Sequence, residues 1–303
     1  MQVKLLLSVI IVSYNTKELL KDCLDSIQLS IEGIEGEIFV VDNNSSDNTI
    51  SLIKAKYKWV KLIENKSNLG FSKANNIAIK KAKGKYLLIL NPDTKLRKDT
   101  ISKMINFMQS RDEIAVTTCR VELPSGSMDR DCRRHFPTPW RAFAHFSGLS
   151  KIFSGSKIFD QYQMGYLSEN TEHEVDSCVG AFMFIRASAI KKVGLFDEDF
   201  FFYGEDLDWC WRFKQLGYKI VYTPVTKIIH YKGAASGIKP PSAHLSKATI
   251  ESKKRAVVES TRAMELFYQK HYTDKYPRLI TWSVILSVKL LEKYRLFKIS
   301  HSL

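Results

Sequence analysis

Short apolar segments alternate with helical patterns over the first 120 residues, and this order limits the fold more than any other feature of the chain. The apolar runs predict buried strands at 5–12, 38–41, 59–63 and 86–90. After the first run, an apolar face recurs at helical spacing, made of Leu19, Leu20, Cys23, Leu24 and Ile27, and Thr16 is placed to cap that helix. Because strands that alternate with helices form parallel sheets, we expect an α/β fold with a mostly parallel central sheet flanked by helices.

Polar residues follow these strands where parallel α/β sheets bind ligands, beyond the carboxyl ends of the strands. Tyr14 follows the first strand, Asp42 closes the second, and Asp93 follows the fourth in an Asn91-Pro92-Asp93 turn. The Asp93 carboxylate could hold a divalent cation against a diphosphate, although such a turn, taken alone, more often has a purely structural role. The sequence therefore predicts a binding site at this edge of the sheet.

Regular patterns return after a weakly patterned stretch at 124–174. We expect a strand at 178–185, helices at 189–193 and 205–216, and short strands at 219–222 and 227–230. The helix at 205 opens with Glu205, Asp206 and Asp208, which complement the helix dipole but are also dense enough for a functional site. Asp208 is spaced to pair with Arg212. His230 ends the last strand, and taken alone it is most simply a structural residue.

The chain changes character after Pro240 and Pro241. Residues 239–303 contain 13 Lys and Arg against 5 Asp and Glu, an excess of 8, and the whole chain carries a net charge of +14. We expect one helix at 246–269 and another from Pro277 onward. The second helix suits an amphipathic helix on anionic lipid, or equally a helix packed on the body with a solvated basic face. Its alternating residues are Leu279, Ile280, Trp282, Val284, Ile285, Val288 and Leu291 with Lys289, Lys293, Arg295 and Lys298.

The positive charge predicts an anionic partner. The basic residues are dispersed and the predicted cleft is acidic, which argues against nucleic acid. No apolar run approaches the roughly 18–20 residues of a membrane span. Five scattered cysteines without zinc-like spacing suit a reducing compartment. We therefore expect a cytoplasmic protein that is peripheral on the inner face of a membrane.

Several short motifs occur together in one order, and jointly they resemble the family 2 glycosyltransferases. In the first half they are 8–15 (SVIIVSYN), 40–47 (VVDNNSSD), 68–71 (NLGF) and 91–93 (NPD). In the second half they are 133–139 (RRHFPTP), 179–183 (VGAFM), 194–198 (GLFDE), 203–212 (YGEDLDWCWR) and 230–236 (HYKGAAS). The second-half motifs are similar to the rhamnosyltransferase-like branch of that family. The resemblance covers roughly residues 5–240.

The resemblance implies a GT-A fold, a nucleotide-sugar donor, inversion at the anomeric carbon and a Mg²⁺ or Mn²⁺ ion. It also implies roles for residues at the edge of the sheet. Tyr14 would pack against the donor base and Asp42 would accept a hydrogen bond from it. Asn15, Asn68 and Gly70 would belong to the same donor site.

The resemblance further implies the metal and catalytic residues. Asn91 and Asp93 occupy the outer positions of the family's Asp-x-Asp motif, in which Asp93 matches the metal-binding end and Asn91 departs from Asp. His230 matches a position that can complete the metal site. Asp206 matches the residue assigned as catalytic base, and Glu205 is a second candidate for that role.

We accordingly divide the chain into a catalytic domain at 1–238 and a basic, amphipathic helical extension at 239–303. Residues 1–120 would bind the nucleotide sugar and 121–238 the acceptor. The expected reaction is transfer of a sugar, rhamnose from dTDP-rhamnose in the first place, to a hydroxyl of a cell-surface or lipid-linked glycan. A UDP-hexose donor and a catalytically silent glycan-binding adaptor are the alternatives. A nucleotidyltransferase would need a Gly-rich loop where 13–16 reads SYNT.

Overall fold

The computed structural model describes residues 5–235, 237–238, 240–246 and 248–301, so that Ser236 of the 230–236 motif lies outside the described residues. The strands are β1 (Leu7–Ser13), β2 (Gly36–Asp42), β3 (Val60–Glu64), β4 (Tyr86–Leu90), β5 (Thr94–Lys95), β6 (Ile114–Glu122), β7 (His173–Glu174), β8 (Phe182–Arg186) and β9 (Lys219–His230). The helices are α1 (Lys17–Ser30), α2 (Thr49–Lys56), α3 (Phe71–Ile79), α4 (Thr100–Gln109), α5 (Pro139–Phe146), α6 (Leu149–Ile152), α7 (Ala187–Val193), α8 (Glu205–Gln215), α9 (Ile250–His271) and α10 (Arg278–Ser300), with 3-10 turns η1 (Arg130–Cys132) and η2 (Pro240–Leu245).

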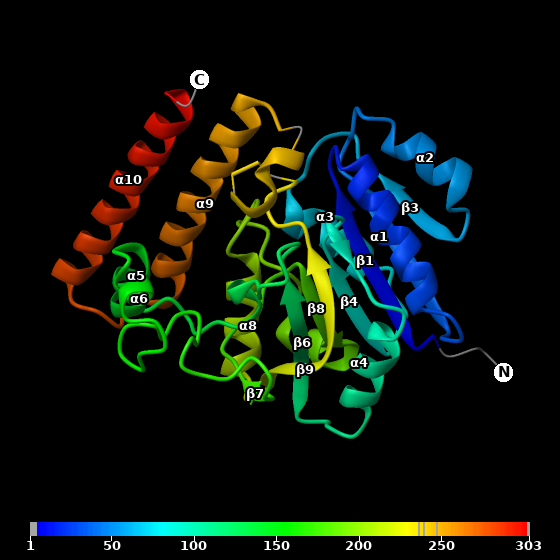
Figure 1. Ribbon diagram of the computed structural model, residues 1–303, viewed down its shortest axis with the longest axis horizontal. Coiled ribbons are helices and arrows are strands. Elements are labelled where there is room, and N and C mark those ends of the chain that lie inside the picture. The colour runs from blue at the N-terminus through cyan, green and yellow to red at the C-terminus, as the bar shows by residue number, and fades with distance from the viewer. Residues whose placement is uncertain (1–4, 236, 239, 247, 302–303) are drawn as a thin grey trace.

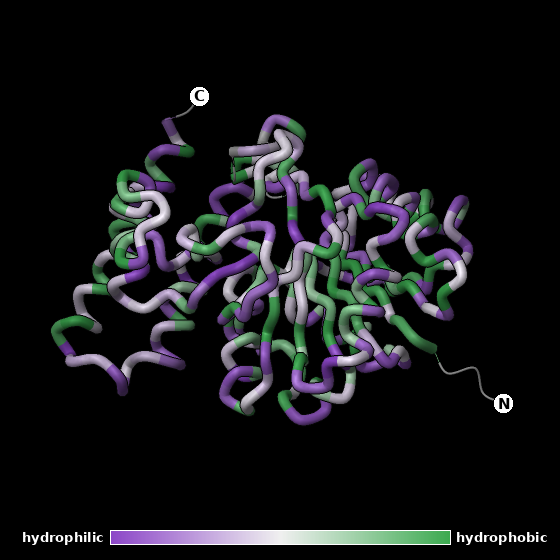
Figure 2. The backbone as a smooth tube through the Cα atoms, turned by 60° about the horizontal axis from the view of Figure 1, so that its bottom comes forward, coloured by the Kyte–Doolittle hydropathy of each residue, from purple (hydrophilic) through white to green (hydrophobic). Residues whose placement is uncertain are grey.

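One mixed sheet runs through the centre of the molecule and is flanked by helices, and α9 and α10 stand together at one end (Figure 1). The strand order is β3-β2-β1-β4-β8-β6-β9-β5, and β7 pairs with β9. Figure 2 shows that hydrophobic segments concentrate in the central strands, whereas the outer turns are polar. This arrangement confirms the predicted α/β fold.

The first four strands form the parallel half of the sheet that the alternating pattern predicts. β1 lies between β2 and β4, and all its residues are buried, which explains its continuous apolar run. α1 buries Leu20, Cys23, Leu24 and Ile27 of the predicted apolar face, whereas Leu19 is only half-buried. Thr16 precedes α1, but its side chain makes no capping hydrogen bond. Instead, the Lys17 N–H donates to Asp47 Oδ2 at 2.8 Å.

The second half of the sheet differs from the predicted strands. β8 begins at Phe182 rather than 178, and it runs antiparallel to β4 and β6. The two short strands predicted at 219–222 and 227–230 are one strand, β9, whose register against β6 shifts between Cys119 and Arg120. Pro224 lies in that shift, where a strand can lose a hydrogen-bond donor. β6 itself is not among the predicted strands.

The C-terminal helices pack on the body through α8. Phe267 of α9 is buried, and its ring centroid lies 5.9 Å from that of Trp211 in α8. α9 begins at Ile250, four residues later than predicted, and α10 begins directly after Pro277. α10 contacts α9 along one side, where Glu292 accepts a hydrogen bond from the Thr261 hydroxyl. α10 thus packs on α9, which belongs to the same C-terminal extension, and none of the residues of α10 is fully buried.

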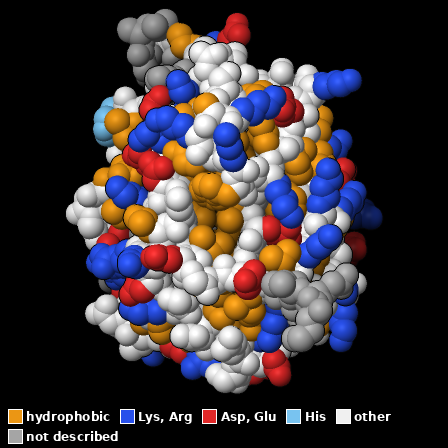
Figure 3. Space-filling model, turned by 90° about the vertical axis from the view of Figure 1, so that its right-hand side faces the viewer, with side chains coloured by type: hydrophobic (Ala, Val, Ile, Leu, Met, Phe, Trp, Pro, Cys, Tyr) orange, Lys and Arg blue, Asp and Glu red, His pale blue; other side chains and the backbone are white. Residues whose placement is uncertain are grey.

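Charge of both signs is dispersed over one face of the molecule (Figure 3). On the face at the right-hand side of Figure 1, Lys and Arg side chains are scattered with Asp and Glu between them (Figure 3). None of the helices in the described part of the chain combines the length and the apolar character needed to cross a bilayer.

Candidate active site

Tyr14, Asn15 and Asp42 lie together at the carboxyl ends of the neighbouring strands β1 and β2. Asp42 is fully buried; its Oδ2 accepts from the Ser45 N–H at 2.8 Å, and its Oδ1 has no hydrogen-bond partner among the described residues. The backbone N–H of Asn15 donates to Ser45 Oγ at 2.9 Å, and the side chain of Tyr14 is 43% exposed. A buried acceptor without a hydrogen-bond partner costs free energy. Asp42 Oδ1 is therefore suited to accept a hydrogen bond from a ligand that also contacts the exposed Tyr14 ring.

Asn68 and Gly70 shape the neighbouring loop. Asn43 Nδ2 donates to Asn68 Oδ1 at 3.3 Å and to the Gly70 carbonyl at 3.1 Å. Gly70 has φ +83°, and a Cβ there would lie 2.5 Å from the carbonyl oxygen of Phe201. Only glycine fits both the positive φ and the close approach, so this loop is tied to the segment that precedes α8.

Asp93 and His230 come together because β5 pairs with β9, which places Thr94 opposite His230. His230 Nε2 lies 3.4 Å from Asp93 Oδ1, and its Nδ1 lies 3.1 Å from Asp129 Oδ2. All three side chains are buried. Burial alone would lower the pKa of His230, but the carboxylates of Asp93 and Asp129 outweigh it and raise that pKa to about 9.

Asp93 and His230 fit a divalent cation as part of its ligand set, provided that the ion displaces the proton that His230 Nε2 carries at pH 7. Asp93 Oδ1 is buried without a hydrogen-bond partner in the described structure, and the His230 ring faces it. Asp129 on the other ring nitrogen resembles the carboxylates that orient metal-bound histidines. Lys232 lies 2.5 Å from both Asp129 and Asp131, so those carboxylates already have a counter-charge. The described residues include no cluster of three His, Cys, Asp or Glu able to hold an ion, so diphosphate oxygens would complete the set.

Asp206 lies in the first turn of α8 and is held on both oxygens. Its Oδ2 accepts from Arg134 Nη2 at 2.9 Å and from the Gly180 N–H at 3.1 Å, and its Oδ1 accepts from the Leu207 N–H at 2.7 Å. The Asp206 and Arg134 side chains are 9% and 10% exposed. Because arginine keeps its charge in proteins, Asp206 is paired with a permanent cation out of water.

The segment that precedes β8 links Asp206 to the Asn91–Asp93 turn. The Gly180 N–H donates to Asp206, and the carbonyl of the following residue, Ala181, accepts from the Asn91 N–H at 3.2 Å. Two consecutive residues thus bind both predicted acidic regions. The arrangement sets a desolvated, positioned carboxylate on one side of the site and a partial cation ligand set on the other.

The other acidic residues of α8 have different environments. Glu205 is buried, and its Oε2 has no hydrogen-bond partner among the described residues. Burial, and next the charge of Asp206, raise the pKa of Glu205 to about 8. Asp208 binds Arg212 Nε at 2.8 Å, as its spacing predicts, and His271 Nε2 at 2.9 Å. Asp208 therefore connects α8 to α9, whereas Glu205 is neutral at pH 7.

Glu205 makes folding stability depend on pH, and Glu205→Gln should remove this dependence. The unfolded side chain ionises above its ordinary pKa of 4.5, while the folded one keeps its proton up to about pH 8. Its contribution to stability is complete below pH 4.5 and is lost as pH rises toward 8. From pH 6 to 8 the wild type should lose about 2 kcal/mol of unfolding free energy that Glu205→Gln keeps. Urea unfolding of both proteins measures this; equal losses would contradict a neutral Glu205.

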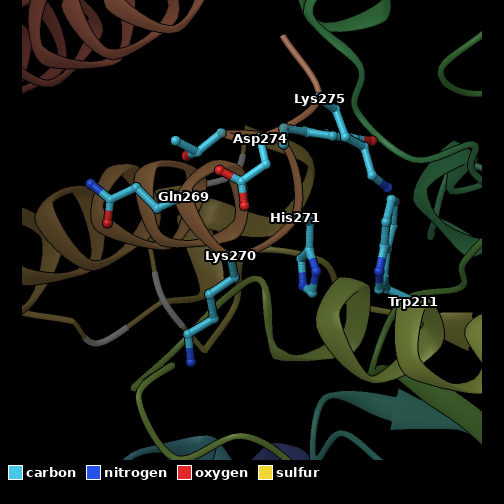
Figure 4. A pocket seen from close by; sticks show the side chains of 8 residues that line it. Trp211, Gln269, Lys270, His271, Asp274 and Lys275 are labelled. Atoms are coloured by element: carbon cyan, nitrogen blue, oxygen red, sulfur yellow. The ribbon is translucent and has the colours of Figure 1, made fainter.

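A separate hollow lies at the carboxyl end of α9 (Figure 4). It has a volume of about 230 Å³ and is lined by Trp211 and by residues 269–275. Its His271 side chain is bound to Asp208, and Lys275 Nζ lies 4.3 Å from the centroid of a Trp211 ring. These contacts fasten the end of α9 to the body, and none of the predicted site residues lines this hollow.

Four residues that contact the predicted site have no role assigned from the sequence. Arg134, Gly180 and Lys232 lie within the resembling motifs 133–139, 179–183 and 230–236, which is the only signal that could have found them. Asp129 lies in no motif and is 101 residues away from the histidine that it contacts.

Known proteins show similarity to this chain in sequence and in fold. The family model for glycosyl transferase family 2 matches residues 8–194. The rhamnosyltransferase WbbL of Escherichia coli K12 is 28% identical over 231 residues, which are 74% of this chain and 82% of WbbL. The N-acetylglucosaminyl-diphospho-decaprenol L-rhamnosyltransferase of Mycobacterium tuberculosis H37Rv is 26% identical over 251 residues, 79% of this chain and 80% of that protein.

A solved structure extends the likeness to the fold of nearly the whole chain. The crystal structure of GalNAc-T7 with UDP, GalNAc and Mn²⁺ matches with a TM-score of 0.55 at 16% identity, over 99% of this chain and 58% of that one. At this identity the likeness shows the fold alone, which is the predicted GT-A fold. The matched range of the family model is more than half of the chain and includes Tyr14, Asp42 and Asp93. The chain is thus a glycosyltransferase that belongs to glycosyltransferase family 2, with rhamnosyltransferases among its relatives.

Proposed function

We propose that the chain is an inverting, divalent-metal-dependent transferase that moves rhamnose from dTDP-rhamnose to a hydroxyl of a cell-surface or lipid-linked glycan. The observation that carries the proposal is the carboxylate of Asp206, held by Arg134 and Gly180 beside the Asn91–Asp93 turn. Two relatives are named as rhamnosyltransferases, and one name contains a diphospho-decaprenol group. These names support the choice of sugar and of a lipid-linked acceptor.

The donor nucleotide occupies the edge formed by β1 and β2. The exposed ring of Tyr14 stacks on the base, and the unpaired Oδ1 of Asp42 accepts a hydrogen bond from it. Asn15, Asn68 and Gly70 hold the surrounding loops through the hydrogen bonds described above. The missing side chain at Gly70 lets this loop lie against the segment that leads into α8.

Asp93 and His230 would hold Mg²⁺ or Mn²⁺. Such an ion, when bound, neutralises the charge of the departing nucleoside diphosphate. Asp129 keeps the His230 ring in position through its other nitrogen. Asn91 contributes through its backbone, which is tied to Ala181, so the replacement of the motif's first Asp leaves the turn in place.

Asp206 is the general base. The acceptor oxygen forms a bond to the anomeric carbon while the bond from that carbon to the diphosphate breaks, and the hydroxyl proton passes to a carboxylate oxygen of Asp206. Attack from the face opposite to the leaving group inverts the configuration. Arg134 and the Gly180 N–H hold the carboxylate in one orientation, which is the condition for effective base catalysis. Glu205, neutral at pH 7, adds no second negative charge beside it.

A thermal-shift panel with dTDP, UDP and GDP, each with Mn²⁺, Mg²⁺ or EDTA, tests the donor and the metal together. A nucleotide at about 100 times its dissociation constant should add roughly 2.7 kcal/mol, about 4 °C for a chain of this size. We expect this shift with dTDP and a metal ion, and its loss with EDTA. A UDP-selective shift would instead indicate a hexose donor, and no shift with any nucleotide would contradict the donor site.

We also propose that the protein is cytoplasmic and that α10 lies on the anionic inner face of the membrane. The side of α10 that faces away from α9 exposes an apolar side chain on each turn, and exposed Lys289, Lys293 and Lys298 lie among or beside these side chains. Anionic lipid attracts such flanking cations while the apolar side chains enter the interface. The apolar side chains of this outer stripe are Leu279, Trp282, Leu286, Leu290, Tyr294 and Phe297, each at least 40% exposed.

A further inference from the structure

A second exposed apolar surface lies on α5 and α6, outside the active site. Six large apolar side chains of the segment 139–158 are between 45% and 73% exposed. Elsewhere in the described chain, apart from α10, such side chains are mostly isolated on separate elements. Contiguous exposed apolar surface marks a binding face rather than ordinary surface. The six side chains, which we call the aromatic wedge, are Trp140, Phe143, Phe146, Ile152, Phe153 and Ile158.

Internal contacts give the wedge a defined shape. Trp140 Nε1 donates to the Ile158 carbonyl at 3.0 Å, which joins the start and the end of the segment. The ring of Phe159 lies 5.8 Å from that of Trp140 and 4.9 Å from that of Phe153. The apolar side chains are thus exposed on an ordered segment, so that binding through them loses little further conformational entropy.

The helices α5 and α6, which carry part of the wedge, lie at the same end of the molecule as α10 (Figure 1). Phe136, three residues before α5, packs its ring 4.7 Å from Trp211 and 6.3 Å from Phe267 of α9. α9 in turn carries α10. The start of the wedge segment is therefore fixed to α9, and α9 is packed against α10, which exposes the other apolar stripe.

Charge identifies the occupant of this end as an anionic bilayer. Residues 139–158 contain no Asp or Glu, and Lys151 and Lys157 are exposed among the apolar side chains. α10 carries five basic residues and one acidic residue, Glu292, which is bound to Thr261. Two such faces would repel each other in a dimer, whereas aromatic side chains with flanking lysines match the interface of an anionic membrane.

We propose that the aromatic wedge is a second membrane contact that acts together with α10. This inference rests on the proposed membrane contact of α10 and extends it. A single helix lying on a bilayer leaves the protein free to roll about the helix axis. A second insertion point, attached near the carboxyl end of α9, prevents this rotation. It therefore sets the direction in which the active site faces the lipid-linked acceptor.

Vesicle flotation of the full chain tests the wedge. Phe143→Ser with Ile152→Ser should weaken partition into phosphatidylcholine vesicles that contain phosphatidylglycerol by at least tenfold, because two exposed side chains no longer enter the interface. The matched control is Leu29→Ser with Val225→Ser, which removes two exposed apolar side chains elsewhere and should partition like the wild type. Thermal unfolding of each variant checks that it is folded.

A parallel variant of α10, Trp282→Ser with Phe297→Ser, separates the two proposals. If this variant loses partition but the wedge variant keeps it, the wedge inference is wrong and the α10 proposal stands. If the wild type binds no vesicle, both membrane proposals fail, and a dimer that the wedge substitutions dissociate would identify a second copy as the occupant. Donor binding, read from the thermal-shift panel, tests the glycosyltransferase site independently of either result.

Discussion

Asp206→Asn should lower kcat by about 10²- to 10⁴-fold while the affinity for the donor nucleotide changes little. Asparagine has nearly the same shape and can still accept hydrogen bonds from Arg134 and from the Gly180 N–H. It cannot take up the proton of the acceptor hydroxyl. The loss should therefore appear in turnover and not in the thermal shift that dTDP produces with a metal ion. Steady-state kinetics of sugar transfer, with that shift measured in parallel, checks both parts.

Two matched substitutions make this result specific. Asp199→Asn removes a carboxylate that is 68% exposed and contacts Lys270 near the surface, so it should leave turnover unchanged. Glu205→Gln replaces a carboxyl that is already neutral at pH 7 and should cost less than about tenfold at that pH. If Glu205→Gln reduced turnover as severely as Asp206→Asn, the base would have to be reassigned to Glu205.

Much of the first half of the fold could be predicted because its signals are local. A strand buried on both faces needs a continuous apolar run, and Leu7–Ser13 is such a run. Asp42 is the last residue of β2 and Asp93 lies in the turn after β4, so their places at the carboxyl edge follow from the strand boundaries. The position of His230 beside Asp93 rested on the resemblance, since no local pattern pairs strands as distant in the sequence as β5 and β9.

The second half could be predicted less well because apolar character there does not always mean strand. Cys178 and Ala181 are as deeply buried as β8, yet they precede it. The backbone of Gly180 and Ala181 binds Asp206 and Asn91 instead of a neighbouring strand, so burial serves the site rather than the sheet. A sequence pattern that reports burial alone therefore places the start of this strand four residues too early.

The partners of the predicted acidic residues could not be read from the sequence. Arg134 contacts Asp206 across 72 positions, and its neighbour Arg133 is just as basic and also buried. Arg133 donates to the carbonyls of Leu167 and Ser168, which is a structural role. Arg133 and Arg134 are adjacent, yet one binds backbone carbonyls and the other binds Asp206. Only the fold distinguishes these two roles.

Asp93→Ala should weaken the metal-dependent binding of the donor nucleotide by about 100-fold, or 2.7 kcal/mol. The substitution removes the one carboxylate oxygen at the predicted turn that is buried and lacks a hydrogen-bond partner in the described structure. Isothermal titration of dTDP with Mn²⁺ and with EDTA measures the effect. The expected result is a variant whose affinity with Mn²⁺ falls to the value that the wild type shows with EDTA.

Asp129→Asn and Asp42→Asn are the comparison variants for Asp93→Ala, because each should change the binding of dTDP in a different way. Asp129 contacts the far nitrogen of His230 and not the donor, so Asn there should raise the Mn²⁺ concentration required for half-maximal dTDP binding by about 10- to 100-fold. Asp42→Asn should weaken the binding of dTDP equally with Mn²⁺ and with EDTA, because in the proposed site its unpaired Oδ1 binds the base and not the diphosphate. If Asp93→Ala behaved like Asp42→Asn, with an equal loss in both conditions, Asp93 would be a nucleotide contact and the metal would have to be held elsewhere.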